Sequence, residues 1–151
     1  FNGTQIVTGV PAANRITFFT QDSGTIAAET VTGTLRLESV QNANDQARTA
    51  AATLLGREEP YRALPWFWSE QGPMRLQMAG LLPPSAQTVQ RAGANDHSFT
   101  LFHLHEGRLL CAESVNAPLD HMMSRKLIEA GVPMSAASLA DLSVPLKSLL
   151  V

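Results

Sequence analysis

Tyr61–Gln71, with the sequence YRALPWFWSEQ, contains both tryptophans and the single tyrosine of this 151-residue chain. Side chains of this size, placed so close together, cover a flat surface or anchor an interface. If the segment is a strand, Trp66 and Trp68 share one face and Phe67 lies on the other, because successive side chains of a strand alternate. Two interpretations of the pair stay open. Burial in the core is the default for large aromatic residues, and stacking on an aromatic ring is the alternative.

Residues that follow this segment have the alternation typical of strands. Met74–Met78 alternates strictly, and residues 88–91 do so more weakly. Phe99–His105 and Arg108–Val115 flank the turn residues Glu106-Gly107, which predicts a β-hairpin.

The first 35 residues are rich in threonine and glycine. Short β-prone runs at 5–10, 15–20 and 25–31 alternate with turn chemistry at Pro11 and at 22–24. We therefore expect a small meander of strands in this arm.

A helix is expected over residues 39–55, ended by Gly56 as a C-cap. Its small apolar residues recur at helical spacing. They are Ala43, Ala47, Ala50, Ala51, Leu54 and Leu55. A stripe of alanines predicts burial against a surface that approaches closely. That surface is another helix or a sheet or, near the N-terminal end, a flat ligand.

Residues 118–130 predict a second helix, capped by Asn116 and ended by Gly131. Its expected apolar face consists of Leu119, Met122, Met123, Leu127 and Ala130. Ser135 starts a short third helix that runs through Leu142. The fold class is therefore α+β: an antiparallel sheet with flanking helices, preceded by a β-rich N-terminal segment.

Charge and cysteine content exclude several classes of function. Eleven basic and 13 acidic residues give a net charge of −2, which provides no footprint for nucleic acid or an anionic membrane. Charged residues make up only 16%, which favours contact with another subunit or domain, including a homo-oligomer. Cys111 is the only cysteine, so no intrachain disulfide and no cysteine-based zinc or iron–sulfur site can form, and a reducing cytoplasm fits.

The ends and hydropathy of the chain carry two further expectations. No apolar run approaches the ~18 residues of a membrane span. The start has neither a basic region nor a hydrophobic run, and it is not a methionine, so we expect a chain that is processed, trimmed or part of a longer protein.

Several catalytic motifs are missing from the sequence. There is no Gly-x-Gly-x-x-Gly fingerprint, no phosphate-binding Gly-x-x-x-x-Gly-Lys loop and no Gly-x-Ser-x-Gly setting for a nucleophilic serine. His103 and His105 lie two apart and share a strand face, where they could ligate a metal if His97 or His121 came close. The simpler interpretation is a polar strand face. No catalytic residue and no metal ligand is assigned.

Short motifs in a fixed order resemble the C-terminal part of FAD-dependent ferredoxin and rubredoxin reductases, the reductase components that serve Rieske-type oxygenases and some cytochromes P450. The motifs are ESVQNA at 38–43, PY at 60–61, PWFWSEQ at 65–71, LQMAGL at 76–81, SF at 98–99, GRL at 107–109, SVNAP at 114–118, RKLI at 125–128 and VPLK at 144–147. The resemblance covers residues 35–150, and its most specific element is the aromatic block.

This resemblance implies a division of the chain. Residues 1–56 form the N-terminal β-rich arm plus a helix that resembles the end of an FAD domain, and residues 57–151 resemble the reductase C-terminal α+β domain. The helix that begins at Val40, Gln41 and Asn42 would point its N-terminus at the flavin ring of FAD. Trp66 and Trp68 match positions near the isoalloxazine and on the face where a ferredoxin-type iron–sulfur protein docks. The parent function would be electron transfer from NAD(P)H through FAD to that partner.

Departures from the family weigh against flavin binding by this chain alone. Glu29 and Thr30 stand where the resemblance leads us to expect a glycine and the aspartate that binds the ribityl chain, and we expect no counterpart of residues 1–24 in the family. We therefore expect no reductase turnover from the isolated chain. The rival hypotheses are a non-catalytic interaction or dimerisation module that has lost nucleotide and flavin binding, and a fragment of a full reductase.

Overall fold

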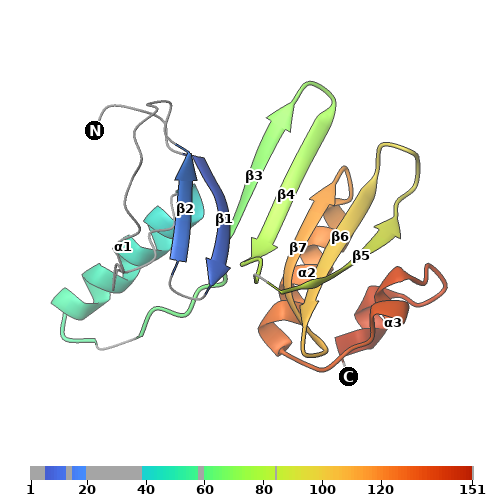
Figure 1. Cartoon of the computed structure of the whole chain (residues 1–151). Helices are drawn as coiled ribbons and strands as arrows, with labels where there is room; N and C mark the ends of the chain where they lie inside the picture. The colour runs from blue at the N-terminus through green and yellow to red at the C-terminus, as the bar shows by residue number, and fades with distance from the viewer. Residues whose placement is uncertain (1–5, 13–14, 20–38, 58–59, 84, 151) are drawn as a thin grey trace.

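The computed structural model describes residues 6–12, 15–19, 39–57, 60–83 and 85–150. Its centre is an antiparallel sheet with the strand order β3-β4-β7-β6-β5 (Figure 1). The strands are β3 Trp66–Gln71, β4 Met74–Gly80, β5 Gln87–Ala92, β6 Phe99–His105 and β7 Arg108–Val115. The helices are α1 Val40–Leu54, α2 Pro118–Ala130 and α3 Ala136–Ala140, followed by a 3-10 helix over Leu146–Leu150. The α+β fold with its antiparallel sheet and flanking helices is confirmed.

The β6–β7 hairpin forms where the sequence predicts it. Glu106 and Gly107 both have positive φ, 50° and 72°, which is the conformation of the tight turns that match the twist of paired strands. β3 and β4 pair in register from Trp66 opposite Ala79 to Gln71 opposite Met74.

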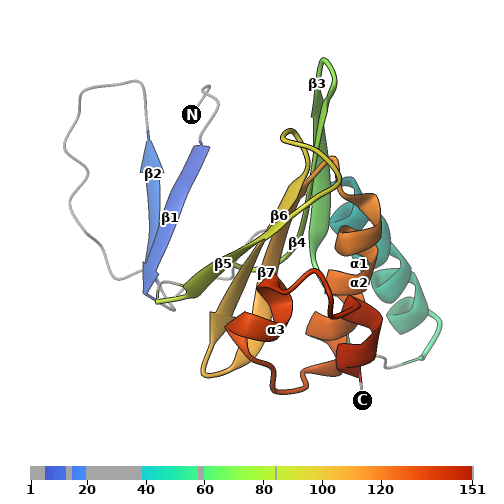
Figure 2. The ribbon, with the colours of Figure 1, turned by 90° about the vertical axis from the view of Figure 1, so that its right-hand side faces the viewer.

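Helices α1, α2 and α3 all lie on one side of the five-stranded sheet (Figure 2). α2 packs on β4 and β7, α3 on β5, and α1 on β3. Between sheet and helices lies the buried core, which consists of Phe102, Leu104, Leu109, Ala112, Leu127, Leu139 and Leu146. Each fully buried large side chain there contributes about 1.5–3 kcal/mol relative to exposure.

A buried arginine ties the C-terminal segment to the sheet. Arg91 of β5 is 8% exposed, and its guanidinium donates to the carbonyls of Leu139 at 3.0 Å, Asp141 at 2.7 Å and Val144 at 3.2 Å. Its Nε lies 3.8 Å from a carboxylate oxygen of Asp120. The positive charge thus lies at the C-terminal end of α3, where carbonyls without helical partners favour a cation.

Helix α2 buries only part of the face predicted for it: Leu127 is buried and Met123 packs against the core, as expected. Its buried residues are His121, Ser124 and Leu127, whereas Leu119 is 72% and Met122 48% exposed. The sheet beneath presents small and polar groups, so small and polar helix residues fit against it. The predicted cap is also wrong.

Asn116 does not cap α2, because its side chain joins two other segments. Its Oδ1 accepts from the backbone N–H of Arg75 at 2.9 Å, and its Nδ2 donates to the carbonyl of His97 at 3.0 Å. The N-cap position is occupied by Ala117, without a side-chain cap. Gly131 ends the helix with φ 61°, as predicted.

Helix α1 forms where predicted, but its alanine stripe is not buried. Ser39 caps it by accepting from the N–H of Asn42 at 3.1 Å. The buried residues are the polar Gln41 and Asn42, because only the first turn meets the sheet. The exposed residues are Ala43, Ala47, Ala50, Ala51, Leu54 and Leu55, with Leu54 88% and Leu55 76% exposed.

The N-terminal arm contains an antiparallel pair, β1 Ile6–Ala12 and β2 Arg15–Phe19. β1 continues past Pro11, where a turn was predicted, and a register shift between Gly9 and Ala12 accompanies the proline. The run predicted at 25–31, with Glu29 and Thr30, lies outside the described residues.

Candidate functional site

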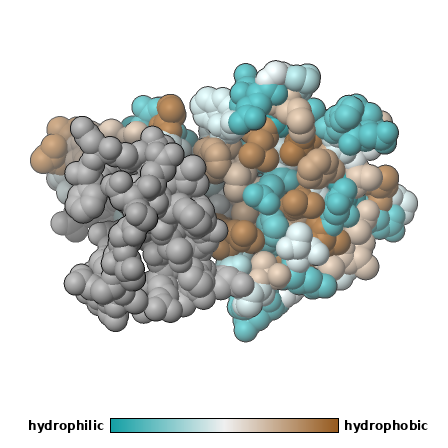
Figure 3. All heavy atoms as spheres, turned by 45° about the horizontal axis from the view of Figure 1, so that its top comes forward, coloured by the Kyte–Doolittle hydropathy of each residue, from teal (hydrophilic) through white to brown (hydrophobic). Residues whose placement is uncertain are grey.

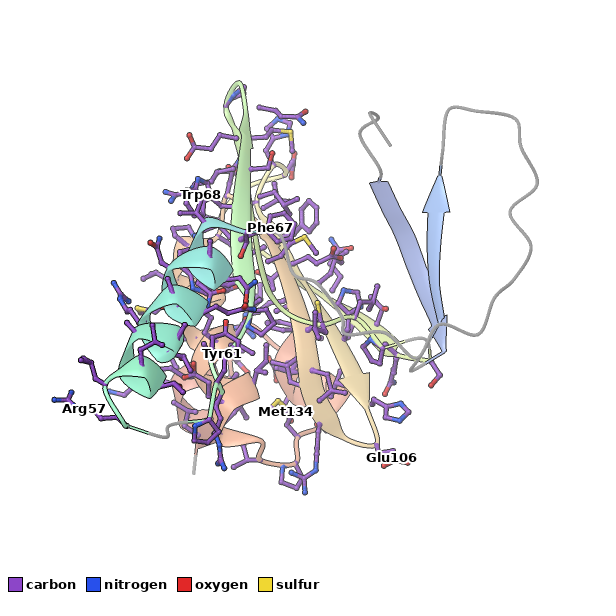
Figure 4. The ribbon with its side chains drawn as sticks, turned by 90° about the vertical axis from the view of Figure 1, so that its left-hand side faces the viewer. Arg57, Tyr61, Phe67, Trp68, Glu106 and Met134 are labelled. Atoms are coloured by element: carbon purple, nitrogen blue, oxygen red, sulfur yellow. The ribbon has the colours of Figure 1, made fainter. Side chains whose placement is uncertain are left out.

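The two tryptophans lie on the same face of β3, toward the helices. Their rings are stacked, with centroids 5.5 Å apart and an interplanar angle of 29°. Trp68 is 42% exposed and Trp66 is half-buried, so the interpretation of the pair as core is wrong. Phe67 lies on the opposite face and is also 42% exposed. Figure 4 shows Trp68 on the α1 side of β3, with Phe67 on the other side.

Polar side chains hold the N-terminus of α1 against the start of β3. Gln41 Oε1 accepts from the backbone N–H of Trp66 at 3.2 Å, which satisfies a donor on the free edge of the sheet. Asn42 Oδ1 accepts from the hydroxyl of Tyr61 at 2.8 Å and from the amide of Gln46 at 3.1 Å. Tyr61, labelled in Figure 4, therefore connects the loop before β3 to the helix. The aromatic block and the leading end of α1 are thus adjacent.

Between α1, β3 and α2 the surface forms a hollow of about 370 Å³. Its lining consists of Val40, Gln41, Asn44, Asp45, Arg48, Trp66, Trp68 and Arg125. Four of the five residues predicted for a cofactor site are in this lining. The fifth, Asn42, is buried beside it and shapes the helix start.

The prediction missed four lining residues, for two reasons. Asn44 and Asp45 follow Val40 and Gln41 by four residues each, and Arg48 follows Asn44 and Asp45 by four and three, so helical periodicity alone could have found them. Arg125 comes from α2, far along the chain, and no local pattern links it to the tryptophans.

Of the charged residues that line the hollow, Asp45 and Arg48 form an ion pair and Arg125 does not. Asp45 accepts from Gln41 Nε2 at 2.5 Å and pairs with Arg48 at 3.2 Å. Arg125 has no salt bridge to any residue that the structure describes, and its guanidinium lies 4.8 Å from the centroid of the Trp66 ring. The floor is therefore aromatic, one wall is positive, and a helix N-terminus adjoins it. This combination suits a planar ring that carries or develops negative charge.

His121 adds a third neighbour to Trp66, at 6.1 Å between ring centroids. It is 5% exposed. Its Nδ1 has no hydrogen-bond partner among the described residues, and neither has Nε of Arg125. Burial, with the nearby charges of Arg125 and Arg75, lowers the pKa of the His121 imidazole, so the ring is held neutral.

On the other face of the sheet, His103 lies in a polar cluster that crosses three strands. Its Nε2 is 3.0 Å from a carboxylate oxygen of Glu113, and its Nδ1 is 3.0 Å from the hydroxyl of Thr88. The hydrogen bond from His103 lowers the pKa of Glu113. His105 instead approaches Ser85, at 3.4 Å. Within the described parts of the chain no three histidine, cysteine or acidic residues come together as metal ligands.

Cys111 is 1% exposed in the middle of β7, as expected for a small apolar residue. Burial, reinforced by the charge of Glu113, raises the pKa of its thiol to about 12. The thiol is therefore inert toward nucleophilic chemistry.

No helix in the described segments is both long enough and apolar enough to cross a bilayer. On the face that Figure 3 shows, apolar and polar residues are interspersed among the residues that the structure describes.

The five-stranded sheet and helices α2 and α3 fall within a segment that matches a known protein family. The family model described as "Reductase C-terminal" matches residues 66–150. The chain belongs to this family.

Several similar proteins are named as reductases. Rhodocoxin reductase of Rhodococcus erythropolis is 47% identical over 115 residues, which is 76% of this chain and 27% of the relative. A solved structure described as the ferredoxin reductase for the CYP199A2 system from Rhodopseudomonas palustris superposes with a TM-score of 0.72 at 43% identity, over 78% of this chain and 29% of that one. A second solved structure, of a covalent putidaredoxin reductase–putidaredoxin complex, superposes with a TM-score of 0.71 at 37% identity. The match covers 77% of this chain and 28% of that one.

The ferredoxin–NAD(+) reductase component of an anthranilate 1,2-dioxygenase system from Burkholderia cepacia is 38% identical over 151 residues, which is 99% of this chain and 37% of the relative. The expectation that residues 1–24 have no counterpart in the family is therefore wrong. The chain spans about a quarter to a third of the length of these relatives.

Proposed function

We propose that this chain is the C-terminal part of a flavin-dependent ferredoxin reductase, which passes electrons from NAD(P)H through FAD to a ferredoxin-type iron–sulfur protein. The observation that carries the proposal is the hollow, in which Trp66 and Trp68 meet the leading end of α1. The proposal divides the chain at residues 56 and 57. Residues 1–56 complete a flavin domain, and residues 57–151 form the reductase C-terminal domain.

The residues of the hollow fit the ring of FAD, which when bound accepts a hydride and releases single electrons. Trp66 and Trp68 supply a flat apolar floor, and Val40 and Gln41 place the N-terminus of α1 beside it. A helix N-terminus stabilises negative charge that develops on the ring. Asn42 holds that terminus in place through its bonds to Tyr61 and Gln46.

The uncovered face of α1 supports a longer parent protein. A helix with exposed alanines and leucines at helical spacing normally buries that stripe against another element. We assign the stripe to contact with the rest of the flavin domain. In that assembly the small side chains would allow close approach of the neighbouring backbone.

An iron–sulfur protein is the proposed partner, and the exposed indole of Trp68 is its proposed anchor. Partly exposed tryptophans are enriched where protein interfaces concentrate binding energy. The free, buried thiol of Cys111 fits a reducing cytoplasm as the proposed location.

Tryptophan emission of a chimera, in which residues 35–150 replace the matching C-terminal segment of rhodocoxin reductase, tests the cofactor site, because the chain alone is not expected to hold FAD. Bound flavin quenches the emission of Trp66 and Trp68, and Trp68→Phe and Trp66→Phe each remove part of the quenching. Phe67→Leu, on the opposite face of β3, serves as the matched control and leaves the quenching unchanged. A chimera with bound FAD in which neither tryptophan variant changes the quenching contradicts flavin contact at this hollow.

The same chimera tests the electron-transfer function itself, through its NADH-dependent dye reduction. Retained, flavin-dependent turnover supports the proposal. A yellow chimera without turnover, beside an active parent, contradicts it.

The second candidate is a non-catalytic dimerisation module, favoured by Glu29 and Thr30 at the positions of the family's glycine and aspartate. Sedimentation analysis of the chain distinguishes the two. A colourless, stable dimer without flavin quenching supports the module, and a flavin-binding monomer excludes it.

A further inference from the structure

The indole of Trp66 has three close neighbours, two rings and one guanidinium, and two of the three come from a single helix. Trp68 stacks on it from the same strand. Arg125 and His121, one turn apart on α2, approach it at 4.8 Å and 6.1 Å. The position of the floor of the hollow is therefore set by α2 as well as by β3.

Arg125 lacks the partners that normally fix an arginine. Its Nε is buried and has no acceptor among the described residues, and no described carboxylate forms a salt bridge with it. A buried, unpaired N–H is unfavourable, so another interaction must compensate for it. The contact that the guanidinium makes is with the face of an indole, the best aromatic partner for a cation.

We propose that Arg125 is a positioning residue for Trp66: its guanidinium holds the indole in the floor of the hollow and leaves that wall positively charged. The inference rests on the proposed function for its purpose, since the hollow is where we place the flavin ring. The contact between Arg125 and Trp66 does not depend on a bound flavin. Asp45 already pairs with Arg48, so Arg125 supplies the positive charge that no described acidic side chain neutralises.

Three variants separate this role from general structural support. Arg125→Met removes the charge and keeps a long apolar stem, and Arg125→Lys restores a cation. Lys126→Met removes a charge from the next residue, which is exposed, and is the matched control. Two measurements are made on each variant without flavin present. Circular dichroism records the exciton couplet that two stacked indoles give, and NMR records the indole N–H signals.

The expected result is that Arg125→Met loses at least half of the couplet and broadens the Trp66 indole signal. Arg125→Lys recovers a measurable part of the couplet, and Lys126→Met retains all of it. A folded Arg125→Met variant with an unchanged couplet overturns the proposal. A failure of the lysine variant to recover any couplet overturns the role of the charge.

A reciprocal measurement applies if Arg125→Met does not fold. In the unaltered chain the buried Nε–H of Arg125 is expected to give a slowly exchanging NMR signal. Trp66→Phe is expected to accelerate its exchange at least several-fold, and Phe67→Leu is expected to leave it unchanged. Exchange that is equally slow in Trp66→Phe overturns the proposal. Because neither arm uses flavin, a chain whose chimera fails the quenching test can still pass this test.

Discussion

Replacing Arg91 by methionine is expected to produce a large loss of stability. The guanidinium donates to three carbonyls, at 2.7–3.2 Å, and lies 3.8 Å from Asp120, while only 8% of the residue is exposed. Hydrogen bonds from a charged group are worth about 1.5–3 kcal/mol each, and they do not add fully within one network. Breaking a buried ion pair costs about 3–5 kcal/mol. We expect a loss of about 4 kcal/mol, from a total that is typically about 5–15 kcal/mol.

Urea unfolding followed by far-ultraviolet circular dichroism measures this loss. Thermal unfolding should show a fall in Tm of roughly 10 °C for a chain of this length. Arg57→Met, at an exposed position, is the control and should change the free energy of unfolding by less than about 0.5 kcal/mol. A loss below about 1 kcal/mol for Arg91→Met would refute the reasoning, because the carbonyls would then need no guanidinium.

A second substitution identifies the source of the loss. If part of it comes from the unpaired charge of Asp120, the double variant Arg91→Met, Asp120→Asn is more stable than Arg91→Met alone. If the three hydrogen bonds to carbonyls account for the whole loss of stability, adding Asp120→Asn does not raise the free energy of unfolding of Arg91→Met. The Thr100 hydroxyl, 3.4 Å from Asp120, retains an acceptor in either case.

Three further predictions follow from single sites. Gly80 has φ 80°, and a Cβ there would lie 2.0 Å from the carbonyl oxygen of Leu110, so Gly80→Ala should lower the free energy of unfolding in urea by more than about 3 kcal/mol. Gly72 has φ 57° and open space around it, so Gly72→Ala should lower it by only about 1 kcal/mol. Equal losses for the two variants would contradict the steric argument. Burial lowers the pKa of His121, so as the pH falls below ~6.5 the unfolded chain binds a proton before the folded chain does, and the free energy of unfolding should decline there. His121→Gln should remove that part of the decline. An NMR titration that gives His121 an ordinary pKa would contradict this prediction. The buried thiol of Cys111, with its pKa raised to about 12, should react with a thiol reagent at neutral pH only after denaturation, and rapid labelling of the folded chain would contradict this burial.

Local patterns were sufficient for most of the secondary structure. The β6–β7 hairpin depends on neighbouring residues alone, since Glu106 and Gly107 adopt the turn and the strands on either side pair directly. Gly131 ends α2 for the same reason, because a glycine accepts positive φ without steric conflict. The relation to the reductase family was likewise predicted from the aromatic block, whose part from Trp66 onward lies within the family model.

Which face of each helix is buried could not be predicted from periodicity. In α2 the sheet selects His121, Ser124 and Leu127, and Leu119 is left in solvent. Sequence spacing identifies apolar stripes, but burial depends on the surface that another element presents. The same reason explains why the tryptophan pair forms an exposed floor rather than part of the core.

By itself the sequence determined most of the strands and helices, the β6–β7 turn and the family of this chain, because each depends on neighbouring residues or on a contiguous motif. Only the tertiary structure decided that Arg125 meets Trp66 and that Gln41 reaches the edge of β3, because these contacts join segments far apart in the chain. The hollow is a product of that packing. Its charge and its aromatic floor come from three elements that no local pattern connects.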